Sequence, residues 1–247
     1  MSVPYYPRAE DLLDDRVAKA LDETKRSLER LRDKIEASNA DPKLLESVTM
    51  DMESMFSCRI ENVFDDDLVA GCRRCLKPDN QSDSAADIEW ICSSVKGEEM
   101  GIRRDGDEVC IMNGFGDVIA EPPDGKCVEG LLEELIEYGE DEDIDPLIRI
   151  AVYHMMFEAI HPFMDGNGRT GRTMMVRQLI DHGLMDGVYI SPSEYIWKNR
   201  IDYYGLLHMM EVSPDWSRWI VYILECISES CSKTVRILQG KSTPGGD

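Results

Sequence analysis

The chain has 247 residues, of which 43% are hydrophobic, and its formal net charge at pH 7 is −22. This apolar content supports a globular domain with a core of its own and excludes a disordered chain. The negative charge argues against a general nucleic-acid-binding protein, because a phosphate backbone would be repelled. No apolar stretch is long enough to cross a bilayer, so we expect a soluble protein and no membrane partner.

The eight cysteines are expected to be free thiols of a cytoplasmic protein, because the N-terminus has neither the basic start nor the apolar run of a signal peptide. Cys72 and Cys75 form a Cys-x-x-Cys pair. No second pair follows with zinc-binding spacing, and no strand-to-helix redox context precedes this one. We therefore interpret the pair as part of a buried or half-buried helical face.

Apolar residues at three- and four-residue steps predict a long amphipathic helix from Glu10 to about Ile35, after an extended lead-in over residues 1–9. Asp41 and Pro42 then offer the cap and the first position of a second helix. The apolar side chains expected to point inward from this second helix are Leu44, Leu45, Val48, Met52 and Met55.

The second helix also carries a polar pair, Ser57 and Glu61, which lie four residues apart and so share one helical face. Asn62 follows directly and can adopt the left-handed conformation that ends a helix. In an acidic chain such a glutamate is usually a solvated surface charge or a partner within its own helix. The motif at residues 161–172 favours a specific contact instead.

A β-hairpin is predicted between Gly97 and Ala120, where glycine-containing turns separate two short apolar runs. Residues 147–160 are apolar on nearly every side, so they predict a central buried helix in which His154 is a core residue. In addition to the first two, the helices predicted along the chain cover residues 64–76, 85–95, 128–136, 147–160, 173–180, 191–207 and 216–227.

The buried helix runs directly into the sequence HPFMDGNGRTGR, residues 161–172. His161 is the only group of this motif that can accept a proton near neutral pH, which makes it the candidate general base. Asp165 is a hard oxygen ligand of the kind that binds Mg2+ together with substrate phosphates. Arg169 and Arg172 lie three residues apart, so both guanidinium groups can point toward one polyphosphate.

The three glycines of the motif let the backbone turn tightly and expose its N–H groups just before a helix. Free amides and the helix dipole favour a phosphate there, and Asn167 can donate to a phosphate oxygen. Phosphoryl transfer requires mainly positioning and charge neutralisation, and these groups supply both. The motif also begins like a calcium loop, but Arg169, Thr170 and Val176 occupy the fifth, sixth and twelfth positions, which excludes that alternative.

At every fixed position the motif matches the signature of the Fic family, His-x-Phe-x-Asp/Glu-Gly-Asn-Gly-Arg-x-x-Arg. This resemblance implies a transferase that moves AMP from ATP to a hydroxyl side chain of a target protein. By the same resemblance the expected roles are His161 as base, Asp165 as the ligand of Mg2+ (or Mn2+), Gly166, Asn167 and Gly168 as the anion-binding turn, Arg169 and Arg172 as ligands of the β- and γ-phosphates, and Phe163 as the core anchor.

The segment containing Ser57, Glu61 and Asn62 resembles the inhibitory Ser-x-x-x-Glu-Asn motif of the Fic subclass that carries its own inhibitor ahead of the catalytic loop. In that subclass the glutamate pairs with the last arginine of the signature. The resemblance therefore implies that Glu61 pairs with Arg172 and occupies the place of the γ-phosphate. A guanidinium group that binds phosphate also binds carboxylate, so the contact is chemically reasonable.

The resemblance also implies that the hairpin is a flap, which pairs with the backbone of the target and presents a Ser, Thr or Tyr hydroxyl to His161. Asn199 and Tyr203 lie four residues apart in a region that resembles the nucleoside side of the family's site. An amide and a ring suit adenine recognition, but tyrosines at helical spacing serve packing at least as often, so both interpretations stay open.

We therefore expect a mostly α-helical, Fic-like bundle with a short β-hairpin flap over residues 44–239, in which the inhibitory helix covers about 44–62 and the flap about 97–121. Residues 1–43 would be an N-terminal extension with the long helix, and residues 240–247 a flexible tail. Two alternatives remain: a related enzyme that removes AMP or transfers another phosphate-containing group, and a non-catalytic module that senses ATP. The target, self-modification and the oligomeric state stay open.

Overall fold

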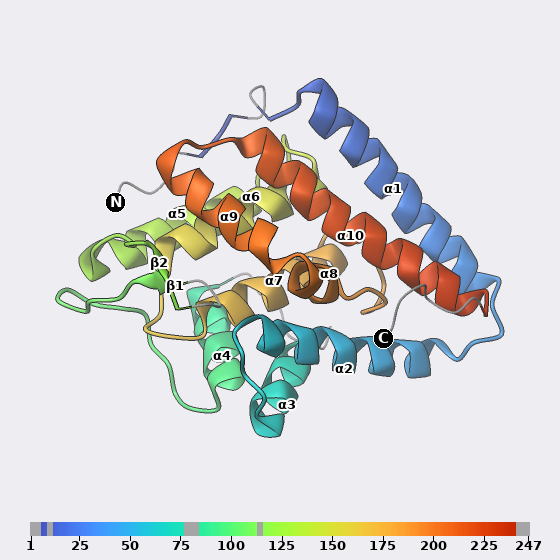
Figure 1. Cartoon of the computed structure of the whole chain (residues 1–247), viewed down its shortest axis with the longest axis horizontal. Coiled ribbons are helices and arrows are strands. Elements are labelled where there is room, and N and C mark those ends of the chain that lie inside the picture. Colours follow the sequence, from blue (N-terminus) through green and yellow to red (C-terminus); the bar gives the residue numbers. More distant parts are fainter. Residues whose placement is uncertain (1–5, 9–11, 77–83, 113–115, 241–247) are drawn as a thin grey trace.

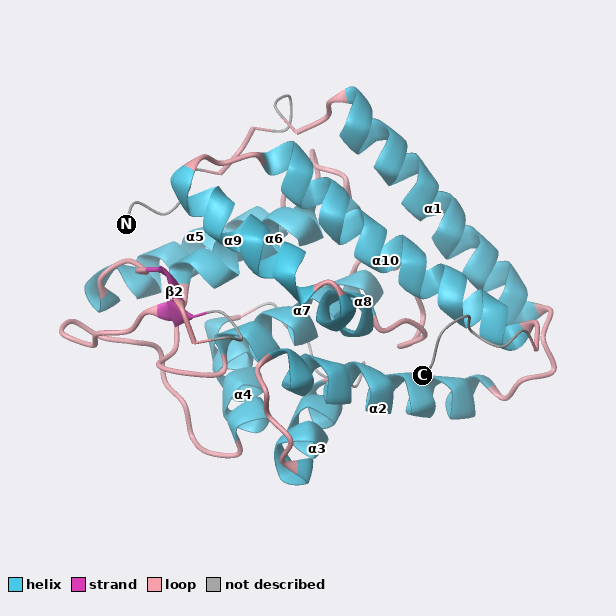
Figure 2. Cartoon of the chain, in the orientation of Figure 1, coloured by secondary structure: helices cyan, strands magenta, loops and turns pink. Residues whose placement is uncertain are grey.

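The computed structural model describes residues 6–8, 12–76, 84–112 and 116–240 of the chain. Helices make up most of this part, together with one two-stranded sheet (Figures 1 and 2). The elements are α1 (Asp15–Glu36), α2 (Pro42–Ile60), α3 (Asp66–Cys75), α4 (Ala85–Lys96), β1 (Ile111–Met112), β2 (Val118–Ala120), the 3-10 helix η2 (Gly125–Cys127), α5 (Val128–Gly139), α6 (Pro146–Ile160), α7 (Asn167–Asp181), α8 (Pro192–Lys198), α9 (Arg200–Val212) and α10 (Trp216–Leu238). The prediction of a mostly α-helical fold with a short hairpin is confirmed.

Several helices begin where a capping side chain precedes them in the sequence. The carboxylate of Asp41 accepts a hydrogen bond from the first turn of α2, in which Pro42 needs no partner for its missing N–H. Asp145 and Pro146 begin α6 in the same way, and Ser84 caps α4. These starts are local events, so the sequence predicts them well.

The centre of the fold is α6, in which every residue after Pro146 is buried. This confirms the central buried helix. Trp219 of α10 donates its indole N–H to the carbonyl of Ala151 at 2.7 Å, which satisfies the polar atom of a large buried ring. His154 is buried against the rings of Tyr203 and Trp219, so it is the core residue that the pattern predicts.

The N-terminal helix α1 lies along α10, at the edge of the molecule farthest from the hairpin (Figure 1). Thr24 donates through Oγ1 to the carbonyl of Leu224 at 3.1 Å, and the hydroxyls of Ser27 and Ser228 lie 2.9 Å apart. Small side chains of this kind let two helices approach closely. Among the described residues, no helix combines the length and apolar character that crossing a membrane requires.

Two predicted helix starts are corrected. α1 begins at Asp15 and not at Glu10, because the carboxylate of Asp14 accepts from the N–H groups of the first turn. α7 begins at Asn167, inside the motif and well before residue 173. Residues 1–5, 9–11 and 241–247 lie outside the described part, so the predicted lead-in and tail are largely not described.

α2 buries a different face from the one that its apolar residues predict. Leu44 and Val48 are 64% and 49% exposed, so the prediction that they point inward is wrong. The buried face carries Glu53, whose carboxylate accepts hydrogen bonds from the side chains of Ser191 and Ser193 at the start of α8. The start of a helix favours a carboxylate, and this polar contact sets how α2 lies on its neighbours.

The hairpin is present but shorter than the segment 97–121. Ile111 pairs with Ala120 and Met112 with Val118, in antiparallel orientation and with an irregular register. Met112 and Val118 are both exposed. The remaining described residues of the segment form loops without regular structure, because only two short runs have alternating apolar residues.

All eight cysteines are free thiols. Cys72 and Cys75 of α3 are buried, which confirms that the Cys-x-x-Cys pair belongs to a packed helical face. Burial raises the pKa of the Cys75 thiol to about 11, so this group is largely protonated at neutral pH.

Candidate active site

The motif and the end of α2 line one cavity of about 790 Å³. Further wall residues come from α4, β1, α6 and α9, so segments far apart in the sequence meet at this place. The residues with predicted roles that line it are Glu61, Asn62, His161, Asp165, Gly166, Asn167, Gly168, Arg169, Arg172 and Tyr203. Ser57 lies behind the wall, and Asn199 does not line the cavity.

His161 ends α6 in the left-handed conformation, with φ 50° and ψ 61°. Its Nδ1 lies 3.3 Å from the carbonyl oxygen of Glu158, which favours the tautomer with the proton on Nδ1. Nε2 is then the nitrogen that can accept a proton. Burial lowers the pKa of His161 to about 4, so the imidazole is neutral, and can act as a base, at neutral pH.

Arg103, which is not among the predicted site residues, positions His161. Its guanidinium donates to the carbonyl oxygens of His161 at 2.7 Å, Ile160 at 3.1 Å and Pro123 at 3.0 Å. Its backbone N–H donates to the carbonyl of Pro162 at 2.8 Å. These contacts hold the left-handed backbone at the end of α6. A single arginine in a polar loop gives no sequence signal for this role.

The side chain of Asn167 shapes the motif loop. Its Oδ1 accepts from the N–H of Phe163 at 2.9 Å, and its Nδ2 donates to the carbonyl of Phe163 at 2.8 Å. Phe163 itself is fully buried, in the position expected of a loop anchor. Both polar atoms of the Asn167 side chain thus have partners within the loop, while Asn167 also lines the cavity; donation of its second Nδ2 hydrogen to a phosphate stays a prediction.

Only one of the three glycines makes the turn. Gly166 has φ 81° and precedes the first residue of α7. Gly168 and Gly171 lie within the helix and are needed for space: a Cβ atom on Gly168 would lie 2.4 Å from Oε1 of Glu61, and one on Gly171 would lie 3.0 Å from Oε1 of Glu158. No side chain caps α7, and its first residues, Asn167, Gly168 and Arg169, line the cavity, so this helix start is suited to bind an anion.

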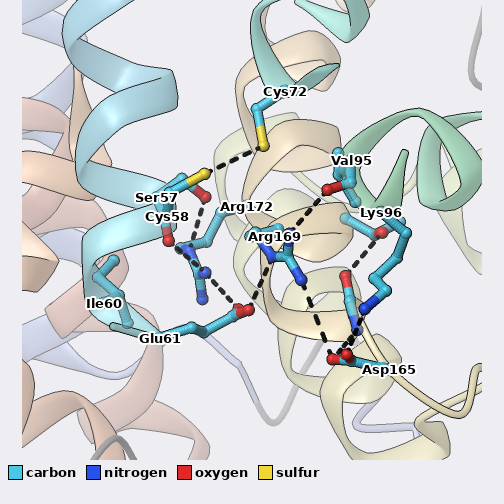
Figure 3. Close-up of polar contacts among 12 residues, drawn as sticks. Ser57, Cys58, Ile60, Glu61, Cys72, Val95, Lys96, Asp165, Arg169 and Arg172 are labelled. Atoms are coloured by element: carbon cyan, nitrogen blue, oxygen red, sulfur yellow. Dashed lines mark hydrogen bonds and ion pairs between the residues drawn. The ribbon is translucent and has the colours of Figure 1, made fainter. Parts of the chain in front are cut away.

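Glu61 bridges the two arginines of the motif (Figure 3). Its Oε2 accepts from Nε of Arg169 at 2.8 Å, and its Oε1 accepts from an Nη of Arg172 at 2.6 Å. The expected contact with Arg172 is thus present in the geometry, and the contact with Arg169 adds to it. Asn62 directly afterwards has φ 57°, the left-handed conformation predicted for the end of α2.

Arg169 and Arg172 are each 2% exposed, so water hardly solvates their positive charges and neighbouring polar groups have to stabilise them. Arg172 donates to the hydroxyl of Ser57 at 3.1 Å and to its carbonyl at 2.9 Å. Burial by itself would lower the pKa of Arg172, but the nearby carboxylate of Glu61 more than offsets this and raises it. Both guanidinium groups therefore stay charged and are held in fixed orientations.

Asp165 is 61% exposed at the cavity edge, and its Oδ2 lies 2.5 Å from Nζ of Lys96. Partial burial opposes ionisation, but hydrogen bonds from Lys96 and from the N–H of Gly166 hold the pKa of Asp165 below its usual range. No group of three or more His, Cys, Asp or Glu side chains in the described residues could hold a metal ion. A single ionised carboxylate fits Mg2+ that is bound mainly by nucleotide phosphates and water.

Of the two residues considered for the nucleoside side, Tyr203 lines the cavity and Asn199 does not. Asn199 connects α8 to α9 and donates through Nδ2 to the carbonyl of Tyr195 at 2.9 Å, away from the cavity. Tyr203 is buried, and its hydroxyl lies 3.0 Å from Nε2 of His154. Its ring therefore serves mainly packing and reaches the cavity only as part of the wall. Tyr204, which is not among the predicted site residues, also lines the cavity and donates to the carbonyl of Ile60 in α2.

Burial of neutral His154 predicts that the protein loses stability in acid. Burial lowers the pKa of His154 to about 3, below that of an unfolded histidine, so its contribution is complete above about pH 6.5 and is lost as the pH falls. For this group alone the loss between pH 7.5 and 5.0 is about 2 kcal/mol. Urea unfolding at both pH values measures it.

The variant His154→Phe should lose less stability than the unmodified protein over the same interval, by about 2 kcal/mol. Contributions from other groups largely cancel in this difference. They include Glu158, whose pKa burial raises to about 7. His208 is exposed on α9, so His208→Gln is the control and should keep the full loss. Equal losses in the His154→Phe variant and the unmodified protein would contradict the prediction.

Comparison with known proteins identifies the motif segment. The sequence model described as the Fic/DOC family matches residues 85–179, from the start of α4 into α7. The chain is 34% identical over 76 residues to a probable protein adenylyltransferase of Aquifex aeolicus (strain VF5), covering 30% of this chain and 24% of that protein. It is 28% identical over 114 residues to protein adenylyltransferase fic-1 of Caenorhabditis elegans, covering 45% and 21%. The matched segments thus span about a quarter or less of these relatives.

The similarity of fold extends over nearly the whole chain. A crystal structure of a Fic family protein from Desulfovibrio desulfuricans G20 matches with a TM-score of 0.79 and 21% identity, covering 99% of this chain and 79% of that one. A structure of Fic-1 from Caenorhabditis elegans, residues 134–508, matches with a TM-score of 0.59 and 19% identity, covering 91% and 75%. The chain thus has the helical fold of these proteins. Within this fold, residues 85–179 are the segment that matches the Fic/DOC family model.

Proposed function

We propose that the protein is an adenylyltransferase that moves AMP from ATP to a Ser, Thr or Tyr hydroxyl of a protein, and that Glu61 inhibits it. The observation that carries this proposal is the position of one carboxylate between two buried arginines, beside the uncapped start of α7 and a neutral histidine. A cavity with this charge arrangement suits a polyphosphate. The relatives named above as protein adenylyltransferases support the same chemistry.

In the proposed reaction the acceptor hydroxyl attacks the α-phosphorus of ATP. A new P–O bond forms, the bond from this phosphorus to the bridging oxygen of the β-phosphate breaks, and pyrophosphate leaves. Nε2 of His161 takes the hydroxyl proton, while Arg103 keeps the backbone of this residue in place. Arg169 and Arg172 hold the β- and γ-phosphates, and the free N–H groups of α7 contribute further donors.

Asp165 is the residue that would hold Mg2+ in this site. The ion, when bound between Asp165 and the nucleotide, would neutralise charge on the α- and β-phosphates. The carboxylate is ionised and accessible from the cavity, as this role requires. Mn2+ would suit the same oxygen ligands.

Inhibition would follow from competition for the guanidinium groups. With Glu61 in place, both arginines have a charge-assisted partner and cannot give the γ-phosphate the same donors. Ser57 supports this state, because its hydroxyl and carbonyl hold Arg172 toward α2. The exposed strand edge of β1 and β2 would bind the target backbone next to the cavity.

Incubation with ATP labelled at the α- or the γ-phosphate tests the function. The Glu61→Gly variant is incubated with each label, alone and with a cell extract, and covalent label is measured after denaturation. Transfer of the α-label alone supports adenylylation, either of a target or of the chain itself. Transfer of the γ-label indicates phosphate transfer, release of AMP from a modified protein indicates the reverse reaction, and binding without transfer indicates an ATP sensor. Each of the last three results contradicts the proposal.

A further inference from the structure

The last turn of α4 lies against the motif loop. The carbonyl of Val95 accepts from an Nη of Arg169 at 2.7 Å. Cys92 donates through Sγ to the carbonyl of Asp165 at 3.5 Å. Nζ of Lys96 contacts the carboxylate of Asp165 (Figure 3). The end of α4 therefore forms part of the wall of the candidate active site, and Lys96 lines the cavity.

The aliphatic part of the Lys96 side chain lies against Gly166. A Cβ atom on Gly166 would lie 2.9 Å from Cγ of Lys96 and 3.1 Å from Cδ, so the missing side chain at 166 leaves room for the lysine. The Lys96 side chain is only 16% exposed. An exposed lysine would have many rotamers, whereas the side chain of Lys96 is largely buried and its Nζ lies much closer to Asp165, at 2.5 Å, than to the exposed carboxylate of Glu98, at 4.0 Å.

The carboxylate contacted by Lys96 is the proposed metal ligand. An ammonium group and a divalent cation at one carboxylate would repel each other strongly in a partly buried site. A metal ion on Asp165 would therefore displace Nζ, while the packed stem keeps it within the cavity. The displaced ammonium would then have two anions within reach, the 68% exposed carboxylate of Glu98 and the polyphosphate that Arg169 and Arg172 bind, and the polyphosphate carries the larger charge.

We propose that Lys96 is a third cation of the polyphosphate site, which pairs with Asp165 in the contact seen here and binds a nucleotide phosphate when a metal ion occupies Asp165. This inference rests on the proposed function and adds a phosphate ligand from outside the motif. Lysine suits the task, because its ammonium is a compact charge with three donors on a flexible stem. The same residue would keep Asp165 ionised and oriented before the metal ion binds.

Binding of MgATP to the full chain, measured by isothermal titration calorimetry, tests this role without any transfer reaction. The Glu61→Gly variant serves as the reference, because its arginines are free to bind. Adding Lys96→Met removes the charge and keeps the stem, and should weaken MgATP binding by about 10-fold, the lower value for a charge-assisted hydrogen bond. Lys96→Arg should retain most of the affinity.

Lys126→Met is the matched control. Lys126 forms an ion pair with Asp124 at 3.1 Å but does not line this cavity, so its loss should leave MgATP binding unchanged. Tripolyphosphate, measured in competition with a fluorescent ATP analogue, should bind the Lys96→Met variant more weakly by the same factor as MgATP. This result would locate the contact on the phosphates.

Unchanged MgATP affinity in a folded Lys96→Met or Lys96→Gln variant would overturn the assignment. A Lys96→Arg variant as weak as Lys96→Met would also contradict it, because loss of the positive charge would then not explain the weaker binding. If the Glu61→Gly reference binds no MgATP, the proposed function fails together with this inference. If it binds MgATP but is insensitive to residue 96, only the role of Lys96 is lost.

Discussion

Replacing His161 is expected to lower AMP transfer at least 100-fold, the lower value for loss of a general base, while ATP binding is retained. The reason is its protonation state and position: burial lowers the pKa of His161 to about 4, and Nε2 is free because Nδ1 faces a backbone carbonyl. The carboxylates of Asp165 and Glu61 are paired with cations, so neither can replace the imidazole as a base.

The substitution has to respect the backbone. Residue 161 has φ 50°, where asparagine is favoured among residues other than glycine, so His161→Asn is the better variant and His161→Ala a second one. Transfer of α-labelled AMP is measured in the Glu61→Gly chain, and ATP binding by calorimetry. His208→Asn, on the exposed side of α9, is the control and should transfer normally. Transfer within a few-fold of the reference in both His161 variants would rule out this base.

Removal of Glu61 is expected to raise ATP affinity and AMP transfer by at least 10-fold. The carboxylate accepts one hydrogen bond from each of Arg169 and Arg172, and a charge-assisted contact of this kind is comparable in strength to the phosphate contact that replaces it. Glu61→Gly frees both arginines. Glu61→Gln keeps the size of the side chain, removes the charge and should have an effect in the same direction.

The same variant should be less stable without nucleotide, because two buried guanidinium groups lose their carboxylate partner. Added MgATP should restore the stability, and the rise in unfolding temperature should be larger than in the unmodified protein. Asp51→Asn is the control on the same helix: its exposed carboxylate pairs with Arg73, far from the motif in sequence. An unchanged transfer rate and an unchanged response to MgATP in Glu61→Gly would exclude inhibition by this residue.

The helices and the motif could be predicted from the sequence because their signals are local. Asp41 with Pro42, and Asp145 with Pro146, mark two helix starts correctly. The segment 147–160, apolar on nearly every side, identified the buried centre. The face of α2 could not be predicted in this way, because a carboxylate at position 53 binds the start of α8, which the hydrophobic pattern does not report.

The sequence by itself determined the helical class, the motif and the residue types that can handle a phosphate, since each depends on neighbours within a few positions. Only the tertiary structure decided which atoms meet. In the folded chain Glu61 contacts two arginines, and Arg103 donates to the carbonyl of His161. Lys96 contacts Asp165, and Asn199 lies away from the cavity. These contacts join separate helices, so their geometry depends on how the helices pack, and no short stretch of sequence carries that information.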